Sequence, residues 1–281
     1  MAVYFLSLKN LSRADGSSSV GAAAYRSGER LRDERTRKVY DHSERQDILH
    51  KEIILPAQSA ALAPDWTKER AALWNAAENA ERRGNARVAR EYLVLLPHEL
   101  DAERRIELAR RFAGELSDRY GFGVDLAVHA PRTHAGSDPR NFHAHLLATT
   151  RSITAAGLGE KTEIEWHDVR RIRAGLGSSV NELLHVRRRW AESANDALAA
   201  SGLDVRIDHR ALSRVNEAMR QTPPSNLVPQ QAPQVAPRSS ETVGDVALRA
   251  ALRWREMRDR GEFQKARENT RERGIDKDYS R

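Results

Sequence analysis

The chain has 281 residues, no cysteine and a formal net charge of +7 at pH 7. The missing thiols exclude disulfides and thiolate metal sites, and no run of residues has the apolar length of a membrane span. The charge favours a polyanionic partner, and arginine supplies 40 of the 47 cationic side chains. Arginine grips phosphate with a planar fork, although a GC-rich genome would produce the same bias. The N-terminus lacks the pattern of a signal peptide, so we expect a cytoplasmic protein.

The first part of the chain alternates short apolar runs with helical patterns. We expect strands at residues 3–8, 47–55 and 85–96, one arm of a hairpin at 39–40, and helices at 20–31 and 65–81. A serine among residues 17–19 would cap the first of these helices. Tyr25 lies to one side of that helix's apolar stripe, among small residues, so it would be open to a large substrate unless it packs between helix and sheet.

The second part continues with a long helix and two adjacent strands. Asp101 would cap a helix that ends at Gly121, strands follow at 124–129 and 142–150, and helices follow at 166–175 and 180–200. Strand pairs joined by short loops indicate antiparallel pairing, so the predicted fold is α+β, an antiparallel β-sheet with helices packed on one face and a C-terminal helical extension. The segment 157–162 lacks the spacing of a phosphate-binding loop.

Composition divides the chain into three parts. Residues 1–212 form the expected globular domain. Residues 213–242 are rich in proline and glutamine and read as a linker. Residues 243–281 begin with an amphipathic helical pattern and continue as a charged tail. The tail would bind an accessory protein or DNA, unless it is simply a disordered end.

Three histidines form the candidate site. In a strand, His143 and His145 point to the same face, and His129 ends the preceding apolar run. If these two runs pair antiparallel, three imidazoles come together. Three ligands leave coordination positions open, as in a catalytic metal site. Spacing alone also permits surface or core histidines without a metal, and neutral imidazole suits manganese, zinc, iron, nickel or copper better than magnesium.

Several motifs in a fixed order resemble the relaxase domain of the MobA/MobL family, conjugative nicking enzymes of the HUH endonuclease class. The matching features are Gly21-Ala22-Ala23-Ala24-Tyr25-Arg26-Ser27-Gly28-Glu29, Arg90-Glu91 before Leu95-Leu96-Pro97, His129-Ala130-Pro131, Asn141-Phe142-His143-Ala144-His145 and Asp208-His209-Arg210. The resemblance covers roughly residues 1–212. Each piece alone is weak, and the combination is specific.

The resemblance implies site residues and a reaction. Tyr25 matches the tyrosine nucleophile, and His129, His143 and His145 match the histidines that hold a divalent metal, Mg²⁺ or Mn²⁺ or another transition metal; His134 competes with His129. Glu91 matches an acidic position that would orient a histidine or accept the tyrosine proton. The implied function is DNA nicking at a plasmid origin of transfer, with a 5′-phosphotyrosine and a free 3′-hydroxyl, followed by rejoining, for conjugative mobilisation.

The implied partners are single-stranded origin DNA, accessory mobilisation proteins and a coupling protein, with no membrane segment. Two other functions remain open from the residues. A metal-dependent phosphodiesterase would use water and leave Tyr25 structural, giving free 5′-phosphate without an adduct. A non-catalytic basic DNA-binding module would use the histidines for packing and would be indifferent to chelators.

Overall fold

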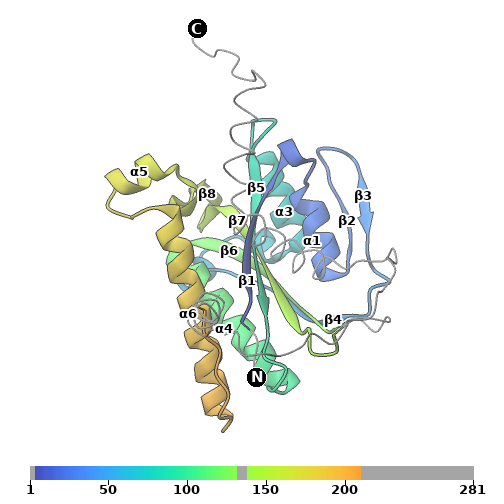
Figure 1. Cartoon of the computed structure of the whole chain (residues 1–281). Coiled ribbons are helices and arrows are strands. Elements are labelled where there is room, and N and C mark those ends of the chain that lie inside the picture. The colour runs from blue at the N-terminus through green and yellow to red at the C-terminus, as the bar shows by residue number, and fades with distance from the viewer. Residues whose placement is uncertain (1–3, 132–137, 210–281) are drawn as a thin grey trace, which may run out of the picture. The chain divides into compact units, whose positions relative to one another are not determined.

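A computed structural model describes residues 4–131 and 138–209 (Figure 1). The strands are β1 Leu6–Ser12, β2 Arg30–Arg32, β3 Val39–Asp41, β4 Ile48–Ile54, β5 Arg87–Leu95, β6 Phe122–His129, β7 His143–Thr154 and β8 Gly157–Lys161. The helices are α1 Ser19–Ser27, α2 Ala57–Ala60, α3 Arg70–Asn79, α4 Ala102–Tyr120, α5 Asp168–Arg173 and α6 Ser179–Ala200. Short 3₁₀ turns occur at Arg13–Asp15, Asp65–Lys68 and Glu163–Glu165.

The main sheet is antiparallel, as predicted. Its strand order is β1-β5-β7-β6-β4, and β8 pairs with β7 beyond this path. The predicted pairing of the two histidine-bearing strands is confirmed, because β6 and β7 are neighbours with His129 opposite His143. A separate two-stranded hairpin is formed by β2 and β3, which confirms the predicted hairpin arm.

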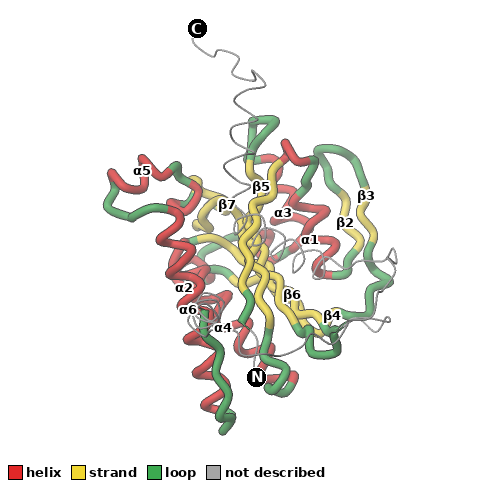
Figure 2. The backbone as a smooth tube through the Cα atoms, in the orientation of Figure 1, coloured by secondary structure: helices red, strands yellow, loops and turns green. Residues whose placement is uncertain are grey.

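Helices cover both faces of this sheet, whereas the sequence placed them on one face (Figure 2). Even-numbered residues of β6 and β7, such as Leu126 and Leu146, pack with α4 and α6. On the opposite face, Leu147 packs with α1 and α3, and the buried Asp125 accepts hydrogen bonds from Arg70 and Trp74 of α3. Both faces of the central strands are buried. The pattern of apolar residues does not predict the second buried face, because a polar residue, Asp125, lies on it.

Helix α1 is shorter than the predicted helix at 20–31. The Ser18 side chain accepts a hydrogen bond from the Gly21 backbone N–H and caps the N-terminus, as expected of a serine there. The helix ends at Gly28, which has a left-handed φ of 63° and donates its N–H to the Ala24 carbonyl. Leu31 therefore belongs to β2 rather than to the helix. The predicted helix at 65–81 likewise begins as a 3₁₀ turn before α3.

The predicted helix after Asp101 is confirmed as α4, with the Asp101 side chain as its cap and Gly121 at its end. The predicted linker at 213–242 and the predicted helical tail at 243–281 lie outside the described residues. Among the described residues, no helix combines the length and the apolar character that crossing a membrane requires.

Candidate metal centre

The imidazoles of His129, His143 and His145 converge on the face of the sheet that carries α1. Each ring offers one nitrogen, and these three nitrogens lie within 4.8 Å of one another. The ring centroids are 4.7–5.2 Å apart. The strand register explains this arrangement, because His129 is directly opposite His143 and His145 follows two residues later on the same face.

The outer nitrogen of each ring is held by a hydrogen-bond acceptor. His129 Nε2 lies 2.7 Å from the Arg26 carbonyl oxygen, His143 Nδ1 lies 2.9 Å from the Asn141 carbonyl oxygen, and His145 Nδ1 lies 2.6 Å from Oε1 of Glu91. Carbonyl and carboxylate oxygens only accept, so each of these nitrogens carries the proton. The other nitrogen of each neutral ring then carries a lone pair, as a metal ligand needs, and that of His129 faces Arg45 Nη2 at 3.4 Å.

The surroundings keep the three rings neutral. Burial, followed by the neighbouring imidazoles, lowers the pKa of His129 to about 2 and that of His143 to about 4. Burial also lowers the pKa of His145, although the Glu91 carboxylate opposes the shift. Neutral imidazoles are metal ligands, whereas protonated ones are not. The donor set therefore fits a divalent ion, and three protein ligands are fewer than such an ion takes.

Glu91, the second candidate catalytic residue, lies against the centre rather than in it. It is on β5, beside β7, and its carboxylate contacts His145 Nδ1 on one side and the Arg26 guanidinium on the other. Burial alone would raise the pKa of Glu91, but the charge of Arg26 and the hydrogen bond from His145 lower it below its usual range. The carboxylate is therefore ionised and firmly paired, which suits a group that orients His145.

Tyr25 lies in the C-terminal half of α1 and is half-buried. Its ring meets the ring of His42 edge-on, with centroids 5.2 Å apart. The Arg45 guanidinium lies over the Tyr25 ring, 4.3 Å from the centroid, and donates a hydrogen bond of 2.5 Å to the Tyr25 carbonyl oxygen. The tyrosine is thus held at the end of the helix nearest the histidines, and not sealed within the core.

Arg45 connects this tyrosine to the histidines. Its Nη2 nitrogen lies 3.4 Å from His129 Nδ1, and Asp47 holds the guanidinium through contacts of 2.8 and 2.5 Å. One cation therefore touches both the tyrosine ring and an imidazole of the centre.

The structure describes five of the six candidate residues. His129, His143 and His145 come together, Glu91 contacts His145, and Tyr25 lies on α1 next to Arg26, whose carbonyl meets His129. His134, the competitor of His129, lies outside the described residues. Arg26 and Arg45 were missed, since arginines are abundant in this chain and the partners of each are far away in sequence. The one feature of the sequence that could have indicated Arg26 is its position directly after Tyr25.

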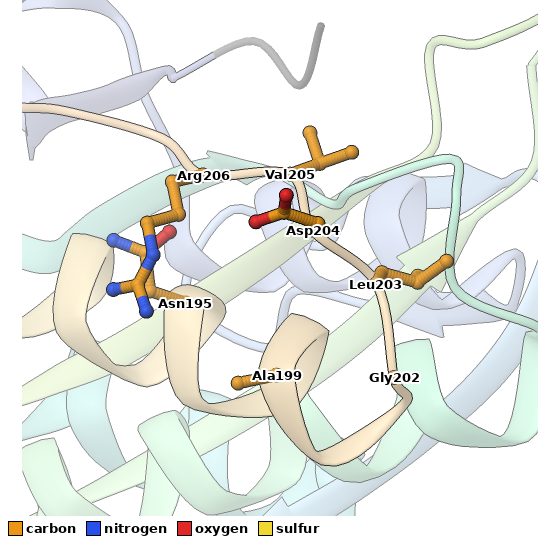
Figure 3. Close-up of a pocket in the computed structure, with 7 residues that line it drawn as sticks. All are labelled: Asn195, Ala199, Gly202, Leu203, Asp204, Val205 and Arg206. Atoms are coloured by element: carbon orange, nitrogen blue, oxygen red, sulfur yellow. The ribbon is translucent and has the colours of Figure 1, made fainter.

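Two surface hollows lie elsewhere in the described part of the chain. The first, of about 240 Å³, is formed by the end of α6 and the segment after it (Figure 3). The second, of about 500 Å³, lies at the N-terminal end of α1 and is lined by Arg13, Arg35 and Arg82 among others. No histidine of the centre lines either hollow. These hollows are therefore separate from the triad, of which His129 and His145 are buried.

An antiparallel sheet with three converging imidazoles beside a tyrosine-bearing helix defines a histidine-triad α+β protein. The model of the MobA/MobL family matches residues 17–233, and the chain belongs to that family. It is similar to "Mobilization protein MobL" of Acidithiobacillus ferridurans, with 39% identity over 230 residues, which cover 75% of this chain and 58% of the relative. It is also similar to "Probable conjugal transfer protein TraA" of Sinorhizobium fredii, with 32% identity covering 76% of this chain and 20% of the relative.

A solved structure described as "Molecular Basis of Vancomycin Resistance Transfer in Staphylococcus aureus" shares the fold. It is 30% identical, with a TM-score of 0.60, and the match covers 74% of this chain and 98% of that one. The family predicted from the motifs is thus confirmed, and so is the antiparallel α+β class. The chain spans 58% of the MobL relative and 20% of the TraA relative.

Proposed function

We propose that this chain nicks one strand of DNA at a plasmid origin of transfer, with Tyr25 as the nucleophile. The observation that carries the proposal is the placement of Tyr25 beside the histidine triad. Arg45 touches both the Tyr25 ring and His129, and the residue after Tyr25 accepts a hydrogen bond from His129. The names of the relatives, which refer to mobilization and conjugal transfer, support the same process.

The proposed reaction is a transesterification. The Tyr25 oxygen forms a bond to the scissile phosphorus, the bond from phosphorus to the 3′ oxygen breaks, and the leaving 3′ oxygen takes up a proton in exchange for the one that the phenol releases to solvent. The products are a 5′-phosphotyrosine and a free 3′-hydroxyl. Because one phosphodiester replaces another, the reverse attack can rejoin strands without an external energy source. A phenol has an ordinary pKa of about 10 and needs activation to attack at neutral pH.

His129, His143 and His145 would hold the divalent ion. When bound, such an ion polarises the non-bridging oxygens of a phosphate. The triad's neutral nitrogens suit Mn²⁺ better than Mg²⁺, and we propose one of these two or another transition metal. Arg45 would hold the Tyr25 ring and offer a cation to the same phosphate.

We further propose single-stranded DNA as the substrate form, because a stacked duplex restricts the backbone turn that in-line attack requires. Exposed arginines would contact its phosphates and unpaired bases. Plasmid DNA places the activity in the cytoplasm. Accessory mobilisation proteins and a coupling protein are the proposed protein partners.

An adduct assay tests the proposal. The protein is incubated with Mn²⁺ and single-stranded origin oligonucleotides labelled at either end, and the products are separated under denaturing conditions. The expected result is a covalent adduct carrying the 3′ portion of the DNA, together with a released 5′ portion that ends in a 3′-hydroxyl. Tyr25→Phe should abolish the adduct, and Tyr40→Phe, which changes a phenol elsewhere near α1, should retain it.

The other outcomes identify the competing functions. Free 5′-phosphate without an adduct, at an undiminished rate in Tyr25→Phe, would show a phosphodiesterase that uses water. DNA binding without cleavage, unaffected by EDTA and by His143→Ala, would show a non-catalytic binding module. An equal yield of adduct from Tyr25→Phe and the parent protein would remove Tyr25 as the nucleophile.

A further inference from the structure

Arg26 makes contacts that reach both sides of the histidine triad. Its Nε and Nη2 nitrogens donate to the two carboxylate oxygens of Glu91 at 2.5 and 2.6 Å. Its Nη1 nitrogen donates to the Ala22 carbonyl oxygen at 2.8 Å, which ties the side chain to its own helix. Its backbone carbonyl accepts a hydrogen bond of 2.7 Å from His129.

These contacts form a continuous chain of hydrogen bonds. It runs from His145 to Glu91, from Glu91 to the Arg26 side chain, and from the Arg26 carbonyl to His129. It therefore joins strands β7, β5 and β6 to helix α1, and the residue at its centre directly follows Tyr25. A shift of α1 along the sheet would disturb two imidazoles as well as the tyrosine.

We propose that Arg26 is a positioning residue that holds the nucleophile helix in register with the metal centre by setting the orientation of His145 and His129. The proposal rests on the function proposed above. Arg26 touches neither the phosphate nor the ion in this role, and acts through Glu91 and through its own carbonyl.

The energetic reason lies in the burial of Glu91. The exposed fraction of its side chain is 8%, and that of the Arg26 side chain is 13%. A buried carboxylate without its counter-cation is costly, so the Glu91 side chain would turn away from this position. That movement removes the acceptor that holds His145 Nδ1. Loss of such an outer partner typically weakens metal binding by about 10- to 100-fold.

Arg26 could also serve only to stabilise the fold through a buried ion pair. A neighbouring buried ion pair provides the control for this alternative. Arg90 precedes Glu91 on β5, points to the opposite face, and donates to Glu165 at 2.7 Å. Both partners of this pair are also buried, with exposed side-chain fractions of 6% and 2%. Arg90→Ala therefore removes a comparable arginine without touching the triad.

The test measures the affinity of the metal-free protein for Co²⁺ by optical titration, next to thermal unfolding and the rate of adduct formation. Arg26→Ala is expected to weaken Co²⁺ binding by about 10- to 100-fold and to slow the adduct. Added guanidinium ion should restore part of the affinity, because it can occupy the vacated position beside Glu91. Arg90→Ala should lower the unfolding temperature and leave Co²⁺ affinity unchanged.

A second variant keeps the test decisive if Arg26→Ala does not fold. Arg26→Gln retains length and one donor but not the charge, and it should also weaken Co²⁺ binding at least tenfold. The proposal is overturned if a folded Arg26 variant binds Co²⁺ as the parent does, or loses no more affinity than Arg90→Ala. A parent protein that binds Co²⁺ but forms no adduct would refute the nicking function alone, since the Arg26 comparison is made on affinity.

Discussion

Glu91 accepts a hydrogen bond of 2.6 Å from Nδ1 of His145 while the Arg26 guanidinium grips the same carboxylate from the other side. The sequence left two roles open for Glu91, orienting a histidine or accepting the tyrosine proton. A general base works best when its pKa is close to the working pH. The pKa of Glu91 is lowered below its usual range, since Arg26 and His145 outweigh the effect of burial. The geometry therefore favours the orienting role.

Replacing Glu91 by glutamine separates these roles. The variant keeps the shape but loses the charge that holds the proton on His145 Nδ1, so we expect Mn²⁺ affinity to fall by about 10- to 100-fold. If Glu91 acts through the metal, saturating Mn²⁺ should recover most of the single-turnover rate of adduct formation. A rate that stays low at every Mn²⁺ concentration would instead indicate that Glu91 takes the proton.

Arg45 is expected to govern the rate of adduct formation. Its guanidinium stacks on the Tyr25 ring, and a desolvated contact of this kind is worth about 2 kcal/mol. Since about 1.4 kcal/mol corresponds to a tenfold rate change, Arg45→Ala should slow the single-turnover adduct by tenfold or more. Arg30→Ala, which removes an exposed arginine paired with Asp41 on the β2–β3 hairpin, is the control and should have little effect. Equal rates for the two variants would contradict this role.

Removing the metal should stop the reaction without unfolding the protein. The triad lies on strands whose opposite face is buried against α4 and α6, so the sheet does not depend on an ion for its core. We expect EDTA to abolish adduct formation and Mn²⁺ to restore it, with little change in the far-ultraviolet circular dichroism. A loss of secondary structure in EDTA would show that the ion is structural instead.

The histidine triad was predictable because it depends on two short-range rules. Side chains alternate along a strand, which places His143 and His145 together, and an antiparallel connection brings His129 opposite them. The helix bearing Tyr25 followed from its serine cap and apolar stripe. Its end did not, because Leu31 continues the helical spacing beyond Gly28, and the left-handed glycine stops the helix first.

The contacts around the triad were not predictable in the same way. Arg26 meets Glu91 across 65 residues, and Arg45 meets His129 across 84. Such pairings follow from the strand order β1-β5-β7-β6-β4. The spacing of apolar residues along the sequence does not predict that order. The presence of helices on both faces of the sheet could not be predicted either. The buried Asp125 interrupts the apolar pattern on the second face.

Ser18 should contribute to the stability of the nucleophile helix. Its hydroxyl oxygen accepts from the Gly21 N–H, and the hydroxyl donates to the buried Asp33 at 2.8 Å. Loss of a serine cap costs about 0.5–2 kcal/mol, and we expect Ser18→Ala to lower the free energy of unfolding by about this amount. Urea denaturation measures the change, with Ser17→Ala as the matched control. An unchanged midpoint for Ser18→Ala would show that the cap contributes nothing.

Glu182 should make the stability of the helical layer depend on pH. Its carboxylate accepts hydrogen bonds from Tyr120 at 2.7 Å and from Arg119 at 2.9 Å. Burial alone would raise the pKa of Glu182, but these two partners outweigh it and lower the pKa below the usual value. The unfolded chain therefore takes up the proton first as the pH falls, so the stabilisation is present above about pH 4.3 and is lost through the lower folded pKa.

Glu182→Gln tests this dependence. At pH 7 the variant should unfold more easily by about 1–3 kcal/mol, because charged hydrogen bonds are replaced by neutral ones. The difference from the parent protein should shrink as the pH falls below about 4.3, because the unfolded parent chain takes up the proton there and the folded parent does so only through its lower pKa. Urea denaturation at pH 7 and at pH 3.5 measures both values, and Glu192→Gln, a more exposed carboxylate on the same helix, is the control. A difference that stays constant over this range would show that the packing of Glu182, rather than its charge, stabilises the contact between α4 and α6.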